Sequence, residues 1–280
     1  MPAGSLRRVC CAISLVAALA AAAALSAQTQ FARGQDVAPT FEGWEPNPDG
    51  TFSMVFGYLN RNYQEEVDIP VGPNNTIDLG GVADHGQPTH FYSRRQRFVF
   101  KVPVPRDFDK NRRVVWTLIS RGKTNQAKGW MQPEWELNEG VIAENTGGGV
   151  PDLKNKAPSI SGDSSLTAAL NASATITVTA TDDGLPLSRA GRVSVAPTPG
   201  VAPVNTGPAE TLKQGVKISW ILYRGPAQVT FDPNTSPLEY GKPVSLTSKV
   251  SFSAPGTYVL RATATDGQAF THHQVTATVK

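Results

Sequence analysis

Apolar and polar residues alternate in several short stretches of the first half of the chain, as in strands with one buried face. These stretches are 51–59, 66–71, 97–104 and 113–120. One face of the third stretch carries only apolar residues, namely Phe98, Phe100, Val102 and Val104. Pro103 faces the other way and has no N–H to donate, which predicts a sheet edge or a bulge there. No segment sustains a helical period, so residues 38–146 are predicted to form an antiparallel β domain.

A second set of strand-like stretches follows residues 147–156, whose glycines and prolines predict a linker. The chain beyond it is poor in charge and rich in Thr, Ser, Ala and Val, which is typical of a β sandwich. The predicted strands are 174–180, 216–223, 228–231, 245–252, 257–265 and 270–279, with a further strand near Ser159. Val216, Ile218 and Trp220 share one face and are expected in the core. The predicted fold class is therefore all-β.

Several different short motifs lie within residues 157–280. They are Ser219-Trp220, Gln228-Val229-Thr230-Phe231, Ala254-Pro255-Gly256-Thr257-Tyr258, Ala264-Thr265-Asp266-Gly267 and Ala180-Thr181-Asp182-Asp183-Gly184. Together they resemble the PKD-type and cadherin-like immunoglobulin-like domains of secreted bacterial proteins. The resemblance implies an Ig-like β sandwich that serves as a spacer or adhesion module outside the cytoplasm, without catalysis. Residues 187–215 depart from it as a long insertion. Tyr258 occupies the position of a corner tyrosine, whose hydroxyl reaches the backbone in such sandwiches.

The first domain offers less. Residues 41–52, which begin Phe41-Glu42-Gly43-Trp44, and residues 58–62 resemble a segment of uncharacterised secreted bacterial proteins, which implies no activity. Over the whole chain, 40% of residues are hydrophobic and 18% charged, with 25 Gly and 22 Pro. This composition favours a turn-rich β protein over a helical bundle or a disordered chain. The formal charge of +3 is too small to favour a nucleic acid as partner.

The N-terminal segment predicts export. Arg7 and Arg8 precede an uncharged run at 9–27 that ends in small residues, so a signal peptide at 1–27 would be cut near Ser26 or Ala27. The alternative is an uncleaved anchor, because the run is just long enough to span a bilayer. After cleavage no integral membrane segment is expected, and the protein would be periplasmic or extracellular, with a polar lead at 28–37.

Both cysteines, Cys10 and Cys11, lie inside the predicted signal peptide. The mature chain would then have no disulfide, thiolate metal site or cysteine nucleophile. Removal of residues 1–27 takes away Arg7 and Arg8 and no acid, which lowers the formal charge from +3 to +1.

One candidate zinc site combines two histidines and an aspartate. His85 and His90 could share an ion with Asp84, with a fourth position open to water. The alternative is a solvated loop, because the spacing matches no zinc signature. His272 and His273 are adjacent on a predicted strand and so point to opposite faces, which prevents them from gripping one ion together.

Calcium is a second possibility. Asp182, Asp183 and Asp266 lie in turns between strands of the sandwich, and cadherin-like relatives use such acids for Ca²⁺. Calcium takes six to eight oxygen ligands. The alternative is that these Asp-Gly segments simply form turns.

The candidate binding residues are Trp130 and Trp135. If Met131 to Glu134 formed a hairpin loop, the two indoles would become a cross-strand pair on one face. Such a pair could stack on a sugar ring or an apolar partner. The alternative is that both rings cover the core of their own domain.

These features favour an exported, non-catalytic binding, adhesion or structural module whose partner is a protein or glycan at the cell envelope or outside the cell. The chain carries no Gly-x-Ser-x-Gly, His-Glu-x-x-His or phosphate-loop motif. The competing hypothesis is a secreted hydrolase or metal-dependent enzyme that uses the first domain. No cofactor other than calcium is expected.

Overall fold

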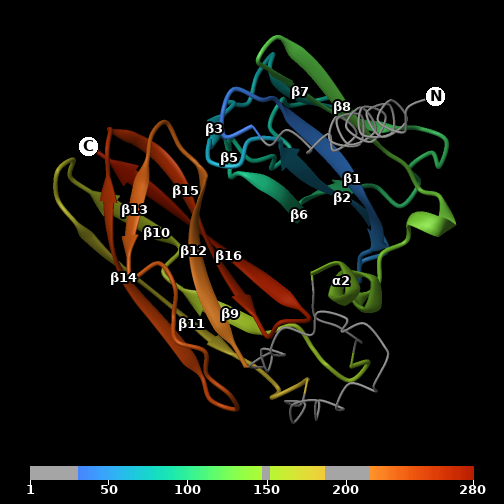
Figure 1. The fold of residues 1–280 in the computed structure, drawn as a ribbon. Helices are drawn as coiled ribbons and strands as arrows, with labels where there is room; N and C mark the ends of the chain where they lie inside the picture. The colour runs from blue at the N-terminus through green and yellow to red at the C-terminus, as the bar shows by residue number, and fades with distance from the viewer. Residues whose placement is uncertain (1–30, 147–151, 187–214) are drawn as a thin grey trace, which may run out of the picture.

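The structure, a computed structural model, describes residues 31–146, 152–186 and 215–280. These residues form two β units that lie side by side (Figure 1). The all-β prediction is confirmed. The predicted signal peptide, the start of the predicted linker and nearly all of the predicted insertion lie outside the described residues.

The first unit contains two three-stranded antiparallel sheets and a two-stranded pair. Their orders are β1-β2-β6, β4-β7-β8 and β3-β5. The strands are β1 (Val37–Pro46), β2 (Phe52–Asn60), β3 (Val67–Asp68), β4 (Asn75–Asp78), β5 (His90–Phe91), β6 (Arg94–Val104), β7 (Val114–Ser120) and β8 (Lys123–Gly129). Fully buried Trp116 on β7 packs against Phe56, Phe91 and Phe100 at its centre. The predicted edge at Pro103 is present, because β6 is the outer strand of its sheet.

A short turn of 3₁₀ helix, η1 (Pro133–Trp135), and the helix α2 (Glu139–Thr146) end the first unit. Neither was predicted. The fixed φ of Pro133 suits the start of a helical turn, so η1 forms where a hairpin loop was considered. Glu134 and Glu136 are both exposed, so their spacing does not indicate a buried face.

The second unit is an Ig-like β sandwich. Its two sheets have the orders β10-β16-β15-β12 and β13-β14-β11-β9. The strands are β9 (Ser159–Gly162), β10 (Ser165–Ala168), β11 (Ala174–Thr181), β12 (Lys217–Arg224), β13 (Val229–Asp232), β14 (Val244–Phe252), β15 (Gly256–Thr265) and β16 (Phe270–Val279). All predicted strands are present, and β10, which pairs in parallel with β16, is an addition.

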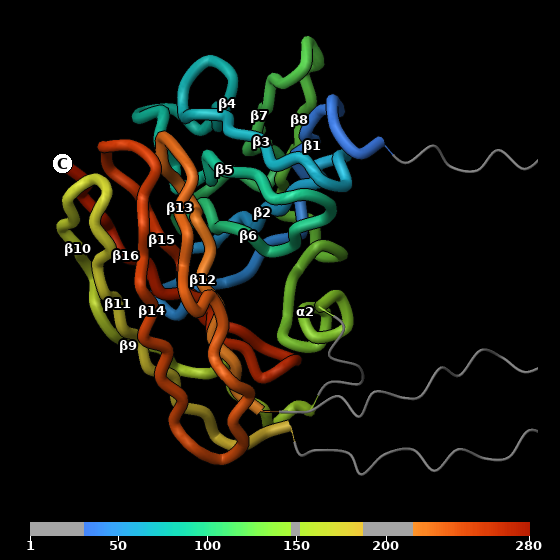
Figure 2. Tube along the Cα trace, turned by 60° about the vertical axis from the view of Figure 1, so that its left-hand side comes forward, coloured from blue at the N-terminus to red at the C-terminus, as the bar shows by residue number. Residues whose placement is uncertain are grey.

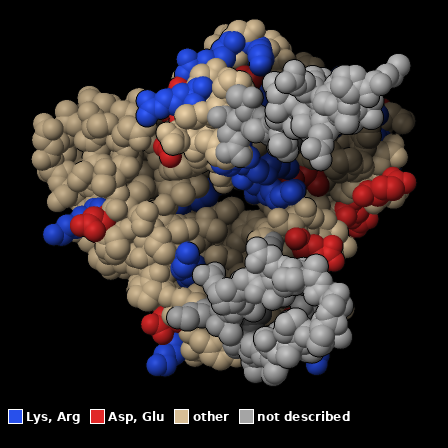
Figure 3. All heavy atoms as spheres, in the orientation of Figure 1, with Lys and Arg blue, Asp and Glu red and all other residues tan. Residues whose placement is uncertain are grey.

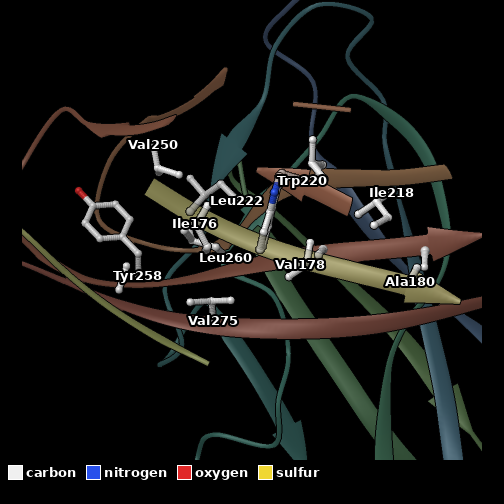
Figure 4. Close-up of a cluster of buried hydrophobic side chains, with 14 of the residues drawn as sticks. Ile176, Val178, Ala180, Ile218, Trp220, Leu222, Val250, Tyr258, Leu260 and Val275 are labelled. Carbon is white, nitrogen blue, oxygen red and sulfur yellow. The ribbon is translucent and has the colours of Figure 1, made fainter. Parts of the chain in front are cut away.

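Side chains from both sheets meet in the core of the sandwich (Figure 4). Val216, Ile218 and Trp220 are buried, as predicted, and the indole of Trp220 stacks on Phe231 with a ring-centroid distance of 5.7 Å. The hydroxyl of Tyr258 donates to the carbonyl of Ala254 at 2.6 Å, which confirms the predicted corner tyrosine. This contact fixes the turn that leads into β15.

Candidate binding site between the two units

A bulge in β12 joins the two units. Inward residues of β12 alternate with outward ones, and the pairing with β15 shifts between Leu222 and Arg224, so that Tyr223 is the extra residue. Tyr223 turns away from its own sandwich. Its side chain is only 3% exposed because it packs in the apolar core of the first unit. The two units therefore share a buried contact, and Figures 1 and 2 both place β12 beside β5.

Hydrogen bonds from Tyr223 and from the residues before and after it also join β12 to the first unit. The hydroxyl of Tyr223 donates to the carbonyl of Gly86, and the amide of Leu222 donates to the hydroxyl oxygen of Tyr92 at 2.8 Å. Burial raises the pKa of Tyr92 to about 12, so the hydroxyl stays protonated at neutral pH. Arg224 reaches both carboxylate oxygens of Asp84 at 2.7 and 2.8 Å. A fork of this kind fixes orientation as well as distance.

The pairing of β2 with β6 is also irregular, and this part of β6 faces the bulge in β12. Residues on either side of Gly57 in β2 pair with Phe100 and Gln96, so three residues of β6, namely Arg97, Phe98 and Val99, stand opposite one glycine. Phe98 takes a positive φ of 50°, which is rare for a bulky residue. A Cβ on Gly57 would lie 2.4 Å from the carbonyl oxygen of Gln96, so only glycine fits there. The ladder is interrupted, which leaves the carbonyl of Val99 free to accept from Arg261 of the second unit.

A cavity of about 450 Å³ lies between these two irregular strands. This volume is within the range of sites that hold small organic ligands, about 300 to 1,000 Å³. The lining residues are Tyr58, Pro88, His90, Tyr92, Ser93, Gln96, Arg97, Phe98 and Val99 from the first unit, and Ser219, Ile221, Leu222, Tyr223, Arg261, Thr263 and His272 from the second. We call this space the seam cavity. On the face shown in Figure 3, Lys and Arg side chains gather beside the hollow near the centre of the molecule.

Arg261 is the least usual residue of the seam cavity. It is 4% exposed, its guanidinium lies 3.5 Å from the ring centroid of Tyr223, and its Nε has no hydrogen-bond partner. Within the described residues no Asp or Glu forms an ion pair with it. Burial lowers the pKa of Arg261 from its ordinary value. A buried charge without a counter-charge is unfavourable, and an anion in the cavity would relieve this.

His272 lines the cavity from β16 and bonds to the hydroxyl of Thr263 at 2.9 Å. His272 is exposed, and desolvation of its ring together with the charges of Arg261 and Lys101 lowers its pKa from the ordinary value. Its ring is therefore neutral at physiological pH. His273 points elsewhere and bonds to the carbonyl of Asp163, so the prediction of opposite faces is confirmed.

The candidate zinc set of Asp84, His85 and His90 does not assemble. His90 is buried, with Nδ1 2.7 Å from Asp68 and Nε2 3.0 Å from Glu66, while Asp84 pairs with Arg224. Burial disfavours the charged ring of His90, but the hydrogen bond to Asp68 and the charges of both carboxylates outweigh it and raise the pKa. Across the three described ranges, no group of three His, Cys, Asp or Glu is arranged to hold a metal ion.

The aspartates considered for calcium serve as turn residues. Asp266 is buried and uses both oxygens, one on the side chain of Asn155 and one on the amides that follow it in the turn. Asp183 accepts from the amides of Lys156 and Leu185. Burial raises the pKa of Asp182, and the charges of Asp266 and Asp183 add to this effect. The carboxylates thus lie near one another, yet their hydrogen bonds support the turn interpretation.

The predicted hairpin between Trp130 and Trp135 is wrong, because η1 occupies that position. The guanidinium carbon of Arg113 lies over the indole of Trp130, 3.2 Å from the centroid of that ring. Trp135 is 43% exposed and packs against Phe41 at 5.5 Å between ring centroids. The two indoles have separate neighbours rather than forming a cross-strand pair.

Sequence reasoning missed the seam cavity. Val259, Arg261 and Thr263 alternate with the inward row of β15 and so gave the pattern of a solvent face. That face is instead covered by the first unit, where Val259 packs on the core. A large aromatic residue on the outward side, Tyr223, was the available signal.

No family model matches this chain, and no curated protein does. Among solved structures, the tandem Ig repeats of Dlar are 11% identical, with 88% of this chain and 97% of that chain covered at a TM-score of 0.29. Domains 4 and 5 of the S-layer protein SbsC are 12% identical, covering 88% and 98% at a TM-score of 0.25. The PKD domain of human KIAA0319 is 18% identical, covering 45% and 83% at a TM-score of 0.20. Values this low carry no argument about function, and the Ig-like assignment stands on the sheets and the corner tyrosine.

Among the described residues, no helix is long and apolar enough to cross a membrane.

Proposed function

We propose that the chain is exported and acts as a non-catalytic binding module, with a protein or glycan of the cell envelope or the extracellular space as partner. The seam cavity carries this proposal, because it offers a ligand-sized space lined by polar groups from two units that share a buried contact. Export is supported by the predicted signal peptide at 1–27. We infer further that the sandwich is of PKD type, on the motifs around Trp220 and Tyr258.

The domain layout belongs to the same proposal. The first unit spans 38–146 and the sandwich 157–280, joined by a linker at 147–156. Trp130 and Trp135 remain individual candidates for contact with a partner, and Trp135 is the more exposed one.

The test uses the mature chain on a glycan array and in capture from envelope fractions. Ser93→Trp places a large side chain in the seam cavity, and Ser164→Trp, at an exposed position, is the matched control. The proposal expects binding that Ser93→Trp abolishes and Ser164→Trp retains, with the bound ligand recovered unchanged. Chemical conversion of the ligand would instead support the enzyme hypothesis. N-terminal sequencing of the exported protein checks for cleavage near Ser26 or Ala27.

A further inference from the structure

The charges that face the seam cavity are unbalanced. Among the described residues that line it, Arg97 and Arg261 are cationic and none is Asp or Glu. Glu42 lies 3.8 Å from Arg97 but also 2.7 Å from Arg95, so it serves two guanidinium groups. No Asp or Glu of the described residues forms an ion pair with Arg261. The field inside the cavity therefore favours an anion.

The carboxylates nearest to the cavity do not cancel this field. Glu66 and Asp68 do not line the cavity but are bonded to the two ring nitrogens of His90, which does, and a ring that donates to both carboxylates offsets part of their charge.

Neutral polar groups and aromatic rings make up much of the remaining wall. Ser93, Gln96, Ser219 and Thr263 supply hydroxyl and amide groups, which can donate to or accept from ligand hydroxyls. Tyr58 and Tyr92 supply rings. The ring of a sugar has apolar C–H faces and a rim of hydroxyls. The faces can pack on the tyrosine rings, and the hydroxyls can bond to the hydroxyl and amide groups of the wall.

We propose that the seam cavity binds an acidic sugar residue, with its carboxylate held by Arg261 and Arg97 and its ring placed among the tyrosines and hydroxyl groups. A planar guanidinium suits a carboxylate because two parallel N–H···O bonds can form. The ligand is either a free sugar acid or the terminal residue of an acidic polysaccharide. This inference rests on the proposed binding function and names the ligand class of the same site.

The experiment is titration calorimetry on the full mature chain with D-glucuronate and D-galacturonate. Glucose and galactose are the neutral counterparts, acetate is an anion without a sugar ring, and a uronate-terminated oligosaccharide distinguishes the chain end from the free sugar. At least one uronate should bind about tenfold or more tighter than its neutral counterpart, as expected for hydrogen bonds to a charged group. Tighter binding of the oligosaccharide than of the monosaccharide assigns the polysaccharide as source.

Three variants accompany the titrations. Arg261→Met keeps the unbranched stem and removes the charge, and should weaken uronate binding about tenfold or more. Arg97→Gln, at the exposed side, should weaken it several-fold without affecting folding. Lys128→Gln removes one charge at an exposed position of β8, away from the cavity lining, and should leave binding unchanged.

Equal affinity for uronate and neutral sugar in the wild type overturns the inference, as does undiminished uronate binding by folded Arg97→Gln and Arg261→Met. If Arg261→Met does not fold, the wild-type comparison and Arg97→Gln still decide. A neutral ligand that Ser93→Trp excludes would refute the acidic sugar while leaving the binding function in place. Absence of any ligand sensitive to Ser93→Trp would refute both.

Discussion

Replacement of Tyr223 tests whether the two units fold as one body. A tyrosine side chain buries about 150 to 250 Å², which at about 25 cal/mol per Å² corresponds to about 4 to 6 kcal/mol. Truncation of buried aromatic residues costs about 3 to 5 kcal/mol. Tyr223 is 3% exposed, so Tyr223→Ala should lower the free energy of unfolding by about this amount. Tyr223→Phe keeps the ring and removes the hydroxyl with its hydrogen bond to Gly86, which should cost about 0.5 to 1.5 kcal/mol.

The location of the loss is as informative as its size. Tyr223 belongs to β12 but packs in the core of the first unit. Tyr223→Ala should therefore weaken the contact between the two units more than it weakens the core of either unit. Scanning calorimetry should show one transition for the wild type and two for Tyr223→Ala. Tyr240→Ala is the control, since Tyr240 is 47% exposed in the same unit and should change stability little. A single transition with unchanged midpoint in Tyr223→Ala would refute the idea that this residue joins the units.

Four further predictions use separate parts of the chain. Tyr258→Phe should cost about 0.5 to 1.5 kcal/mol in denaturant unfolding and Trp220→Ala about 3 to 5 kcal/mol, and equal negligible losses would contradict the core assignment. Burial opposes ionisation of Asp36, but hydrogen bonds from Lys123, Asn125 and Arg61 outweigh it and lower the pKa to about 2. Its stabilising effect is therefore present above pH ~4 and lost as pH falls toward ~2, and Asp36→Asn should flatten this loss in melting curves. The raised pKa of His90 stabilises the folded state below the ordinary value of 6.5 and ceases to do so as pH rises through the higher folded value. The melting temperature of the wild type should thus fall as pH rises through the folded pKa of His90, and the melting temperature of His90→Gln should not fall over the same pH range. Limited proteolysis should cut within 147–156 and within 187–215, yet the fragments should co-elute in gel filtration because of the contact between the units; separation without denaturant would contradict it.

The strands of the sandwich other than β10 could be predicted because their side chains alternate, and the core of the sandwich followed from that alternation. In the first unit β2, β3, β6 and β7 were predicted, whereas β1, β4, β5 and β8 were not. Trp220 and Tyr258 were placed correctly for this reason. The zinc and tryptophan hypotheses failed because nearness in sequence does not determine the partner: His90 finds Asp68 and Glu66, and Trp130 finds Arg113.

The seam cavity could not be predicted, because it depends on two local departures from the strand period. A bulge changes the face of a side chain without leaving a pattern in the sequence. Arg261 gave no signal of burial, since an arginine on the outer face of a strand is ordinarily solvated.

The bulge in β12 also bears on which kinds of mutation this protein tolerates. Tyr223 is one residue more than the ladder with β15 needs, so its deletion would bring Arg224 into regular register opposite Val259. A deletion elsewhere in the strand would put the apolar residues that follow it out of phase and expose them. Loss of this one codon should therefore leave a sandwich with an uninterrupted edge strand and without the aromatic side chain that packs in the core of its neighbour. A single in-frame deletion could thus turn a joined pair of units into two tethered ones.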